Sequence, residues 1–364
     1  MRLLVAAGAS GGGVYPALAV LQELDDESLE LLWVGGEGGM EEALVTRAGF
    51  HLTTLPAAGL HAVGLRSLPG NLWQLFRGYL AARKLIRKWQ PDVLFFTGGF
   101  VAAPVALAGL RVPTAAFVPD MKPGRALRLV SLFADRIAVV SEELARFFRH
   151  PERLVVTGYP LRKEFTGWTR EQGRAEFGLA AKKKTLLVFG GSKGAQSINR
   201  ALLAILPDLL DHMQIIHVTG EANWPEVEAA REELTGEQRK NYFPHPYLHE
   251  TMGAAFAAAD LALARAGAST LGELPAFGLP AILVPLPHET NMVQHHNAAQ
   301  LRASGGAIVM DDADMLTHLQ DAVIDLMTND VRRAEMATAM RAQALPNASQ
   351  RIAEMLRQMG REAA

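Results

Sequence analysis

Short apolar runs alternate with longer amphipathic segments along almost the whole chain. Each run is rich in Val, Leu and Ile and too short for a helix, which predicts a buried strand. The segments between them space their apolar residues for one face of a helix. The expected strands are residues 3–7, 29–34, 93–97, 114–118, 136–140, 154–157, 185–189, 214–219, 261–264, 281–284 and 307–310. The clearest expected helices are residues 40–48, 72–89, 195–206 and 225–234. The alternation predicts an α/β protein with parallel sheets and right-handed crossovers.

Two glycine-rich turns lie at equivalent points of the two halves. Residues 7–13 follow the first expected strand, and residues 190–195 follow the strand at 185–189. Each pattern indicates a strand, a tight turn and the start of a helix. In this arrangement the backbone N–H groups at the helix N-terminus point at a site suited to phosphate. One such turn is equally consistent with simple chain reversal. Two of them predict two doubly wound Rossmann-like domains whose parallel sheets face an interdomain cleft.

The best domain boundary lies near residues 158–162, where an expected strand ends in Gly158 and Pro160. It divides the chain into an N-terminal domain of residues 1–160 and a C-terminal domain of residues 161–345. The polar segment 166–184 is interpreted as the linker region. A final helical pattern at about 346–364 is expected to cross back and pack on the N-terminal domain.

The composition of the 364 residues, 49% hydrophobic and 20% charged, is typical of a soluble globular protein with two cores. The absence of cysteine excludes disulfides, thiolate nucleophiles and Cys-based metal sites. A net charge of only −2 gives no sign of a nucleic-acid partner. The first residues resemble no signal peptide. The uncharged stretch 93–110 is interrupted by Gly98, Gly99 and Pro104, so we expect a strand, a turn and a short helix rather than a membrane span.

Residues 64–90 carry basic residues but no acidic one. The basic side chains are Arg66, Arg77, Arg83, Lys84, Arg87 and Lys88. They are interleaved with aromatic and aliphatic residues that include Trp73, Phe76 and Trp89. A basic amphipathic helix of this composition is typical of a segment that lies on an anionic membrane surface. The alternative is a scaffold helix whose apolar side packs on the sheet and whose basic side is solvated.

Motifs in a fixed order along the chain resemble MurG-type glycosyltransferases. The matching segments are residues 7–20, 98–101, 158–162, 190–195, 265–273, 285–288 and 294–298. The resemblance covers nearly everything from Met1 to Leu345. It implies a GT-B fold and transfer of N-acetylglucosamine (GlcNAc) from UDP-GlcNAc to lipid I, the undecaprenyl-diphospho-muramoyl-pentapeptide.

The resemblance also implies a donor site in the C-terminal half. Ser192 is expected to cap a helix and to bind the diphosphate with Gly191, Lys193 and the guanidinium of Arg162. Glu273 falls where the family binds the ribose hydroxyls, and Leu248 in the segment whose backbone reads the uracil edge. The remaining implied donor contacts are Ala268, Ser269, Thr270, His288 and Gln294. The acceptor and its diphosphate are implied to lie on Ser10, Gly11, Gly12, Gly13, Gly98 and Gly99.

The N-terminal half departs from the family pattern. Gly13 stands where the family has a histidine, and residues 117–120 stand where it has a His-Glu-Gln-Asn run. Phe100 replaces an aromatic residue that carries a hydroxyl, and Tyr159 replaces an asparagine. Residues 291–293 replace an acidic-His run. Donor features are retained, whereas acceptor and base features have mostly changed.

An inverting transfer needs a base for the acceptor hydroxyl and a stabilised diphosphate leaving group. Asp120, just after an expected strand, is the leading candidate base, ahead of His288 and His61. Ser192, the helix N-terminus and Arg162 satisfy the second need without a metal, so no cofactor or metal is expected. The acidic run 311–314 is interpreted as helix capping rather than as a metal site.

Three hypotheses follow for the function. The first is a transferase that makes lipid II, peripheral at the cytoplasmic face of the inner or plasma membrane. The second is a related transferase that moves a UDP-sugar to a different glycolipid or small-molecule acceptor. The third, from another class, is a UDP-GlcNAc epimerase or a non-catalytic UDP-sugar-binding relative.

Overall fold

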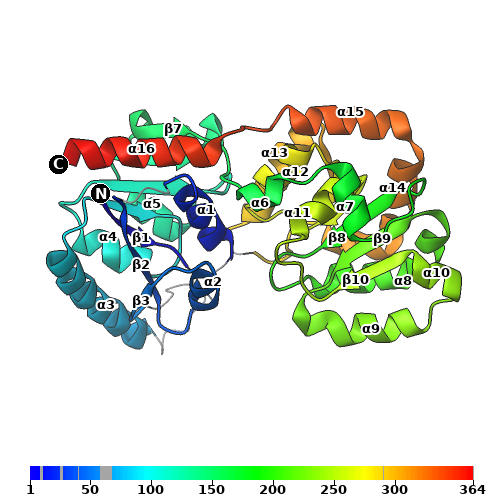
Figure 1. Cartoon of the computed structure of the whole chain (residues 1–364), viewed down its shortest axis with the longest axis horizontal. Helices are drawn as coiled ribbons and strands as arrows, with labels where there is room; N and C mark the ends of the chain where they lie inside the picture. The colour runs from blue at the N-terminus through cyan, green and yellow to red at the C-terminus, as the bar shows by residue number, and fades with distance from the viewer. Residues whose placement is uncertain (9–10, 25–27, 40, 58–67, 290, 364) are drawn as a thin grey trace. The chain divides into compact units, whose positions relative to one another are not determined.

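The computed structural model describes residues 1–8, 11–24, 28–39, 41–57, 68–289 and 291–363. The chain forms two compact units, each with its own parallel sheet (Figure 1). Unit 1 comprises Met1–Arg162 together with Leu345–Ala364, and unit 2 comprises Lys163–Ala344. The chain therefore leaves unit 1, builds all of unit 2 and returns.

Seven parallel strands form the sheet of unit 1 in the order β3-β2-β1-β4-β5-β6-β7. Their bounds are β1 Arg2–Ala6, β2 Glu30–Gly36, β3 Leu52–Leu55, β4 Val93–Phe96, β5 Thr114–Val118, β6 Arg136–Val139 and β7 Leu154–Val156. The central strands β4 and β5 are buried along their whole length, which explains why their sequences are continuous apolar runs. Helices connect the strands of unit 1, as a parallel sheet requires.

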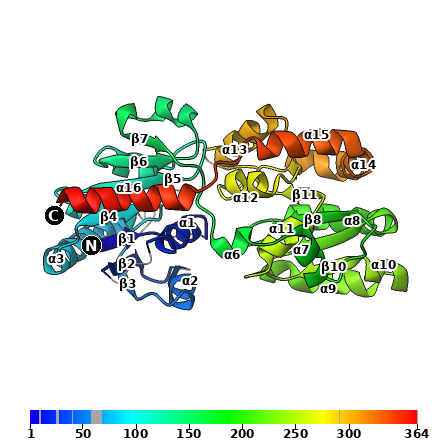
Figure 2. The same ribbon diagram turned by 45° about the horizontal axis from the view of Figure 1, so that its top comes forward.

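The helices of unit 1 include one from the far end of the chain. Their bounds are α1 Gly11–Leu21, α2 Glu41–Arg47, α3 Leu68–Trp89, α4 Ala102–Ala108, α5 Arg125–Ser131 and α16 Ala348–Ala363, with 3-10 turns η1 Glu142–Phe147 and η2 Pro151–Arg153. Helix α16, red in Figures 1 and 2, lies beside α1 and buries Ile352, Leu356 and Met359. Ser349 Oγ donates to the carbonyl of Leu161 at 3.1 Å and ties the returning chain to the departing one.

Six parallel strands form the sheet of unit 2 in the order β10-β9-β8-β11-β12-β13. Their bounds are β8 Thr185–Phe189, β9 Gln214–Val218, β10 Tyr242–His245, β11 Leu261–Ala264, β12 Ala281–Leu283 and β13 Ala307–Val309. The helices are α6 Lys163–Thr166, α7 Arg170–Glu176, α8 Gln196–His212, α9 Trp224–Glu232, α10 Gly236–Lys240, α11 Met252–Ala258, α12 Thr270–Phe277, α13 Val293–Ala303, α14 Met315–Thr328 and α15 Asp330–Arg341, with 3-10 turns η3 Glu221–Asn223 and η4 Asp312–Asp314. The two doubly wound parallel sheets expected from the sequence are confirmed.

Two expectations about the elements are wrong. Residues 166–184 are not a linker throughout, because they contain α7, which packs against α11. Thr169 and Gln172 form a capping box at the start of α7, so this helix has its own N-terminal signal. Helix α8 does not end before Pro207 but continues to His212, with leucines on both sides of the proline buried in the core.

The described part of the chain contains no helix with the length and hydropathy that a bilayer crossing requires. The uncharged stretch 93–110 instead forms β4, a glycine turn and the short helix α4.

Polar side chains are buried in the core of unit 2. Asn199, His217 and Tyr242, on α8, β9 and β10, are each no more than 2% exposed and are joined by hydrogen bonds. Burial lowers the pKa of His217 to about 3 and raises that of the Tyr242 hydroxyl. The His217 imidazole is therefore uncharged at neutral pH.

This buried imidazole predicts an acid-labile unit 2. Between the unfolded pKa of 6.5 and the folded pKa of about 3, only the unfolded chain binds the extra proton. The free energy of unfolding therefore falls as the pH is lowered through this window, by up to about 1.4 kcal/mol per pH unit. Urea titrations between pH 7 and pH 4 measure the slope.

His217→Gln removes the titrating group, so its unfolding free energy is expected to fall less steeply with acid than that of the parent. His212→Gln, at the exposed end of α8, is the matched control and is expected to keep the parent's slope. Equal slopes for the parent and His217→Gln would contradict the prediction.

Candidate active site

The strand order of each sheet reverses at one point. In unit 2 the chain runs outward from β8 to β10 on one side and from β11 to β13 on the other. In unit 1 the same reversal lies between β1 and β4. Loops that leave two such neighbouring strands diverge and open a crevice at the carboxyl edge of the sheet, where α/β proteins bind ligands. Both glycine-rich turns follow a strand at such a reversal.

The turn after β8 packs backbone directly on backbone. Gly191 and Gly194 have φ values of +84° and +73°, and the N–H of Gly194 donates to Gly191 O at 3.0 Å. A Cβ on Gly194 would lie 2.2 Å from Thr219 O, so only glycine fits there. Gly191, Ser192 and Lys193 are exposed, which leaves the outer side of this turn open to a ligand.

The expected capping role of Ser192 is wrong. Helix α8 begins at Gln196, and its N-cap is Ala195, which makes no side-chain hydrogen bond. Ser192 lies within the turn and is exposed. Its proposed contact with a phosphate does not depend on the cap.

The turn after β11 and the start of α12 hold the next expected site residues. Ala268 and Ser269 are half-buried and precede α12, whose first residue Thr270 is 2% exposed and donates to Gly267 O. Glu273 is half-buried in the first turn of α12. A carboxylate there is stabilised by the positive end of the helix.

A buried arginine joins the loops around this site. Arg265 is 8% exposed and donates to the carbonyls of Val284 and Pro285, both at 3.1 Å, and to Ser197 Oγ at 2.6 Å. It forms an ion pair with Asp312 at 2.6 Å. One guanidinium thus holds together the ends of β11 and β12 and the start of α8.

The capping interpretation of the acidic run 311–314 is therefore wrong. Asp311 and Asp314 occupy the N-cap positions of η4 and α14, but neither makes a side-chain cap hydrogen bond. Asp312 instead accepts from Ser197 Oγ at 2.9 Å and pairs with Arg265. Among the described residues, no group of three or more His, Asp or Glu side chains has the geometry to hold a metal ion.

The segment after β12 is held by its own polar side chains. Gln294 Oε1 accepts from the N–H of Leu286 at 3.0 Å, and Glu289 Oε2 accepts from the N–H of Gln294 at 2.8 Å. His288 is exposed and has φ +63°, and Met292 has φ +50°. Two non-glycine residues in the left-handed region mark a shape fixed by its surroundings.

The last residue of the expected donor site follows β10, which lies at an edge of the sheet. Leu248 is 9% exposed. The rings of its neighbours Tyr247 and His249 lie 4.4 Å apart, centroid to centroid. The two rings are tilted by 49° and contact each other on either side of Leu248 in the sequence.

The glycine turn of unit 1 meets the loop after β4. Gly99 has φ +94°, and a Cβ on it would lie 3.0 Å from Gly8 N. Thr97 Oγ1 donates to Gly13 O at 2.5 Å, and a Cβ on Gly13 would lie 3.0 Å from Gly8 O. The structure thus brings Gly13, Gly98 and Gly99 together at the reversal point.

Gly11 and Gly12 are the first residues of α1. Ser10 and His61 lie outside the described residues. Asp120 is half-buried, two residues beyond β5.

The guanidinium of Arg162 contacts an aromatic ring of unit 1. The Cζ atom of Arg162 lies 4.6 Å from the ring centroid of Tyr15 on α1, in a cation–π stack.

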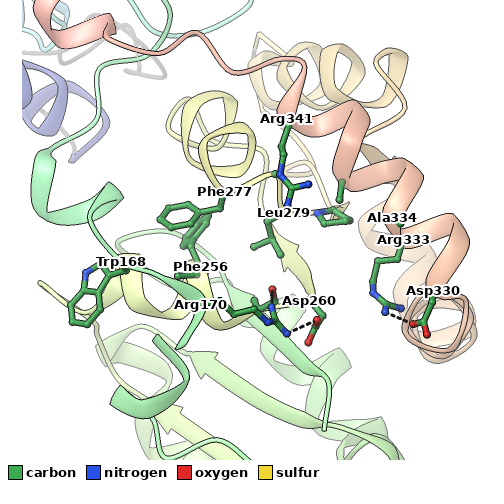
Figure 3. A pocket seen from close by; sticks show the side chains of 15 residues that line it. Trp168, Arg170, Phe256, Asp260, Phe277, Leu279, Asp330, Arg333, Ala334 and Arg341 are labelled. Atoms are coloured by element: carbon green, nitrogen blue, oxygen red, sulfur yellow. Dashed lines mark hydrogen bonds and ion pairs between the residues drawn. The ribbon is translucent and has the colours of Figure 1, made fainter. Parts of the chain in front are cut away.

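A separate pocket of about 340 Å³ lies at the opposite edge of the sheet in unit 2 (Figure 3). It is lined by Asp260 and Pro280, which directly precede β11 and β12, and by Phe256 and Phe277. Arg170, pointing toward Asp260 in Figure 3, forms an ion pair with it at 2.7 Å. The pocket contains none of the site residues expected from the sequence.

Two doubly wound units, each with a glycine turn at its reversal point, define a two-domain Rossmann-like protein. Residues 3–139 match the Glycosyltransferase family 28 N-terminal domain, and residues 185–352 match the Glycosyltransferase family 28 C-terminal domain. This chain belongs to glycosyltransferase family 28.

Curated relatives match over almost their full length. The relative from Halothermothrix orenii is 38% identical, and the match covers 92% of each of the two chains. The relative from Desulforamulus reducens is 35% identical, and the match covers 96% of each. Both are named UDP-N-acetylglucosamine--N-acetylmuramyl-(pentapeptide) pyrophosphoryl-undecaprenol N-acetylglucosamine transferase.

Solved structures share the fold. Acinetobacter baumannii MurG has a TM-score of 0.74 at 24% identity, covering 98% of this chain and 99% of its own. A UDP-GlcNAc 2-epimerase from Neisseria meningitidis has a TM-score of 0.67 at 13% identity, and the match covers 98% of this chain and 100% of the epimerase chain. At these identities the likeness concerns the fold alone, and the GT-B fold expected from the sequence is confirmed.

Proposed function

We propose that this protein transfers GlcNAc from UDP-GlcNAc to lipid I, giving lipid II for peptidoglycan synthesis. The observation that carries the proposal is the near-complete match to relatives that bear the name of this activity, at 35–38% identity. An enzyme with this activity contributes to the cell wall, and through it to cell shape and division.

The donor is proposed to bind at the reversal point of unit 2. The exposed turn of Gly191, Ser192 and Lys193 presents backbone N–H groups to a diphosphate. Glu273, in the first turn of α12, accepts hydrogen bonds from the ribose hydroxyls, and the Leu248 backbone reads uracil. His288 lies beside the donor. Gln294 keeps an NH₂ group for a sugar hydroxyl while its oxygen accepts from the N–H of Leu286.

The leaving diphosphate is proposed to be stabilised without a metal ion. The guanidinium of Arg162 supplies a bidentate positive charge, and its stack on Tyr15 limits its freedom before the ligand arrives. The turn after β8 supplies preorganised N–H donors. In this proposal Arg162 and the turn after β8 together stabilise the charge that develops on the departing UDP.

Asp120 is proposed as the base that takes the proton of the acceptor hydroxyl. It follows β5, the neighbour of β4, at the carboxyl edge of the sheet of unit 1. The acceptor diphosphate is proposed to lie on Gly11, Gly12, Gly13 and the Gly98–Gly99 loop. The absence of a side chain at Gly13 leaves the proton transfer to a group from elsewhere in unit 1.

Helix α3 is proposed to dock the protein on the anionic cytoplasmic leaflet of the inner or plasma membrane. Leu72, Trp73, Phe76 and Leu80 are 48–60% exposed, and their spacing places them on one side of the helix. The other side packs on α4 and β3, where Gly78 lies against the Pro56 carbonyl. Exposed basic side chains follow along the same helix: Arg77, Arg83, Lys84, Arg87 and Lys88. Exposed aromatic groups beside basic ones favour a headgroup surface.

The proposed reaction is tested by UDP release from UDP-GlcNAc, with and without a soluble lipid I analogue. We expect release that depends on the analogue, with a disaccharide product by mass spectrometry. Asp120→Asn is expected to lower kcat by about 10²–10⁴-fold with little change in UDP affinity, because only proton transfer is lost.

UDP release without the analogue, or epimerised sugar, would contradict the transfer reaction. UDP binding with no turnover would direct the search to another acceptor. A parental rate in Asp120→Asn would remove this residue from the mechanism.

The donor site predicts a second result. Arg162→Ala and Glu273→Ala are each expected to weaken UDP binding by about 10–100-fold in calorimetry, because each removes a charged hydrogen-bonding group. Arg200→Ala, on the exposed face of α8, is the matched control and is expected to bind UDP as the parent does. Parental affinity in both site variants would overturn the donor assignment.

The docking surface predicts a third result. Trp73→Ser with Phe76→Ser is expected to lower binding to vesicles that contain anionic lipid by at least about tenfold, through lost apolar burial. The affinity for UDP is expected to stay unchanged. Leu316→Ser, which removes a 76% exposed leucine from α14, is the control, and an equal loss of vesicle binding there would contradict docking through α3.

A further inference from the structure

A chain of buried side chains crosses unit 2 beneath the turn after β8. Tyr242 Oη lies 2.8 Å from His217 Nδ1, and His217 Nε2 lies 3.0 Å from Asn199 Oδ1. Asn199 Nδ2 donates to Thr219 O at 2.9 Å. These groups come from β10, β9 and α8, and they end at the carbonyl that follows β9.

The direction of each hydrogen bond follows from its chemistry. Because Asn199 uses its NH₂ group on Thr219 O, its carbonyl oxygen faces His217 and can only accept. His217 therefore carries its proton on Nε2, and Nδ1 accepts from the Tyr242 hydroxyl. The chain thus runs one way, from Tyr242 to Thr219, and Tyr242 Oη, His217 Nε2 and Asn199 Nδ2 each donate to the next acceptor.

The far end of the chain supports the glycine turn. Thr219 O lies so close to Gly194 that a Cβ there would be 2.2 Å away, and Gly220 lies against the same residue. Asn223 Nδ2 also donates to Thr219 O, at 3.3 Å. Asn199 is linked to the turn a second way, since its own N–H donates to Ala195 O at 2.9 Å.

We propose that Tyr242 and His217 are positioning residues for the donor-diphosphate turn, acting through Asn199 and Thr219. The inference rests on the proposed donor site, because it gives this turn its ligand. Neither side chain contacts the ligand itself. They fix the carbonyl on which Gly194 rests, and Gly194 in turn fixes the Gly191–Gly194 turn that presents N–H groups to phosphate.

A second buried polar group on the same strand provides a matched control. Gln214, at the amino end of β9, is 1% exposed and bonds to Ala180, Lys183 and Thr185. Its partners lie at the edge of the sheet opposite to the turn. Loss of Gln214 weakens the core of unit 2 as loss of His217 does, but it leaves Thr219 untouched.

The experiment compares Tyr242→Phe, His217→Leu, His217→Gln and Gln214→Met. Tyr242→Phe and His217→Leu are expected to raise the Kd of UDP and the KM of UDP-GlcNAc about tenfold, with the acceptor KM unchanged. His217→Gln is expected to recover most of the affinity, because its amide can still donate to Asn199. Gln214→Met is expected to lower the melting temperature without raising the Kd.

Amide hydrogen exchange over residues 190–195, measured without ligand, tests the positioning independently of UDP. Faster exchange in Tyr242→Phe but not in Gln214→Met supports the inference, even for a protein that fails to bind UDP. Unchanged exchange in Tyr242→Phe overturns it. So does a rise in Kd in Gln214→Met equal to that in His217→Leu.

Discussion

Direct contact between backbone segments, with no Cβ between them, is the constraint on which both candidate sites depend. In unit 1, Gly99 lies against Gly8, and in unit 2, Gly194 lies against Thr219 and Gly220. Each contact joins the loops of two neighbouring strands at the carboxyl edge of a parallel sheet. A side chain at either glycine would push the loops apart, and the N–H groups would lose the shape that suits a phosphate.

The sequence alone predicts the inner framework of both sheets. Every expected strand is present, because strands buried on both faces are continuous apolar runs. The two missed strands, β3 and β10, each lie at one edge of their sheet, whereas the strands at the opposite edges, β7 and β13, are among those expected. An edge strand is open to solvent on one side and tolerates polar residues and proline, as Thr53, Thr54 and Pro244 illustrate. Neither β3 nor β10 is a continuous aliphatic run, in contrast to the edge strands β7 and β13.

The candidate site is less predictable than the strands, because its support comes from distant parts of the chain. The glycine turns follow from local patterns, and the family resemblance supplies roles for their neighbours. The ion pair of Arg265 with Asp312, and the chain from Tyr242 to Asn199, join residues that no local spacing connects. The motif of residues 265–273 contains Arg265 but does not indicate that Asp312 is its ion-pair partner. Glu289 accepts a hydrogen bond from the N–H of Gln294. No signal in the sequence distinguishes it from a carboxylate on the surface.

The return of α16 to unit 1 has a consequence for synthesis on the ribosome. Unit 2 is one continuous stretch of chain, so it has all its parts once residue 344 has emerged. Most of unit 1 is synthesised first, but unit 1 lacks α16, the helix that packs on α1, until residues 348–363 have emerged. Domains generally fold in the order in which they are synthesised. In this chain, unit 1 begins to be synthesised first but is completed after unit 2. A chain stopped after Ala344 would contain a complete unit 2, but its unit 1 would expose the apolar face that α16 covers, and chaperones bind such faces.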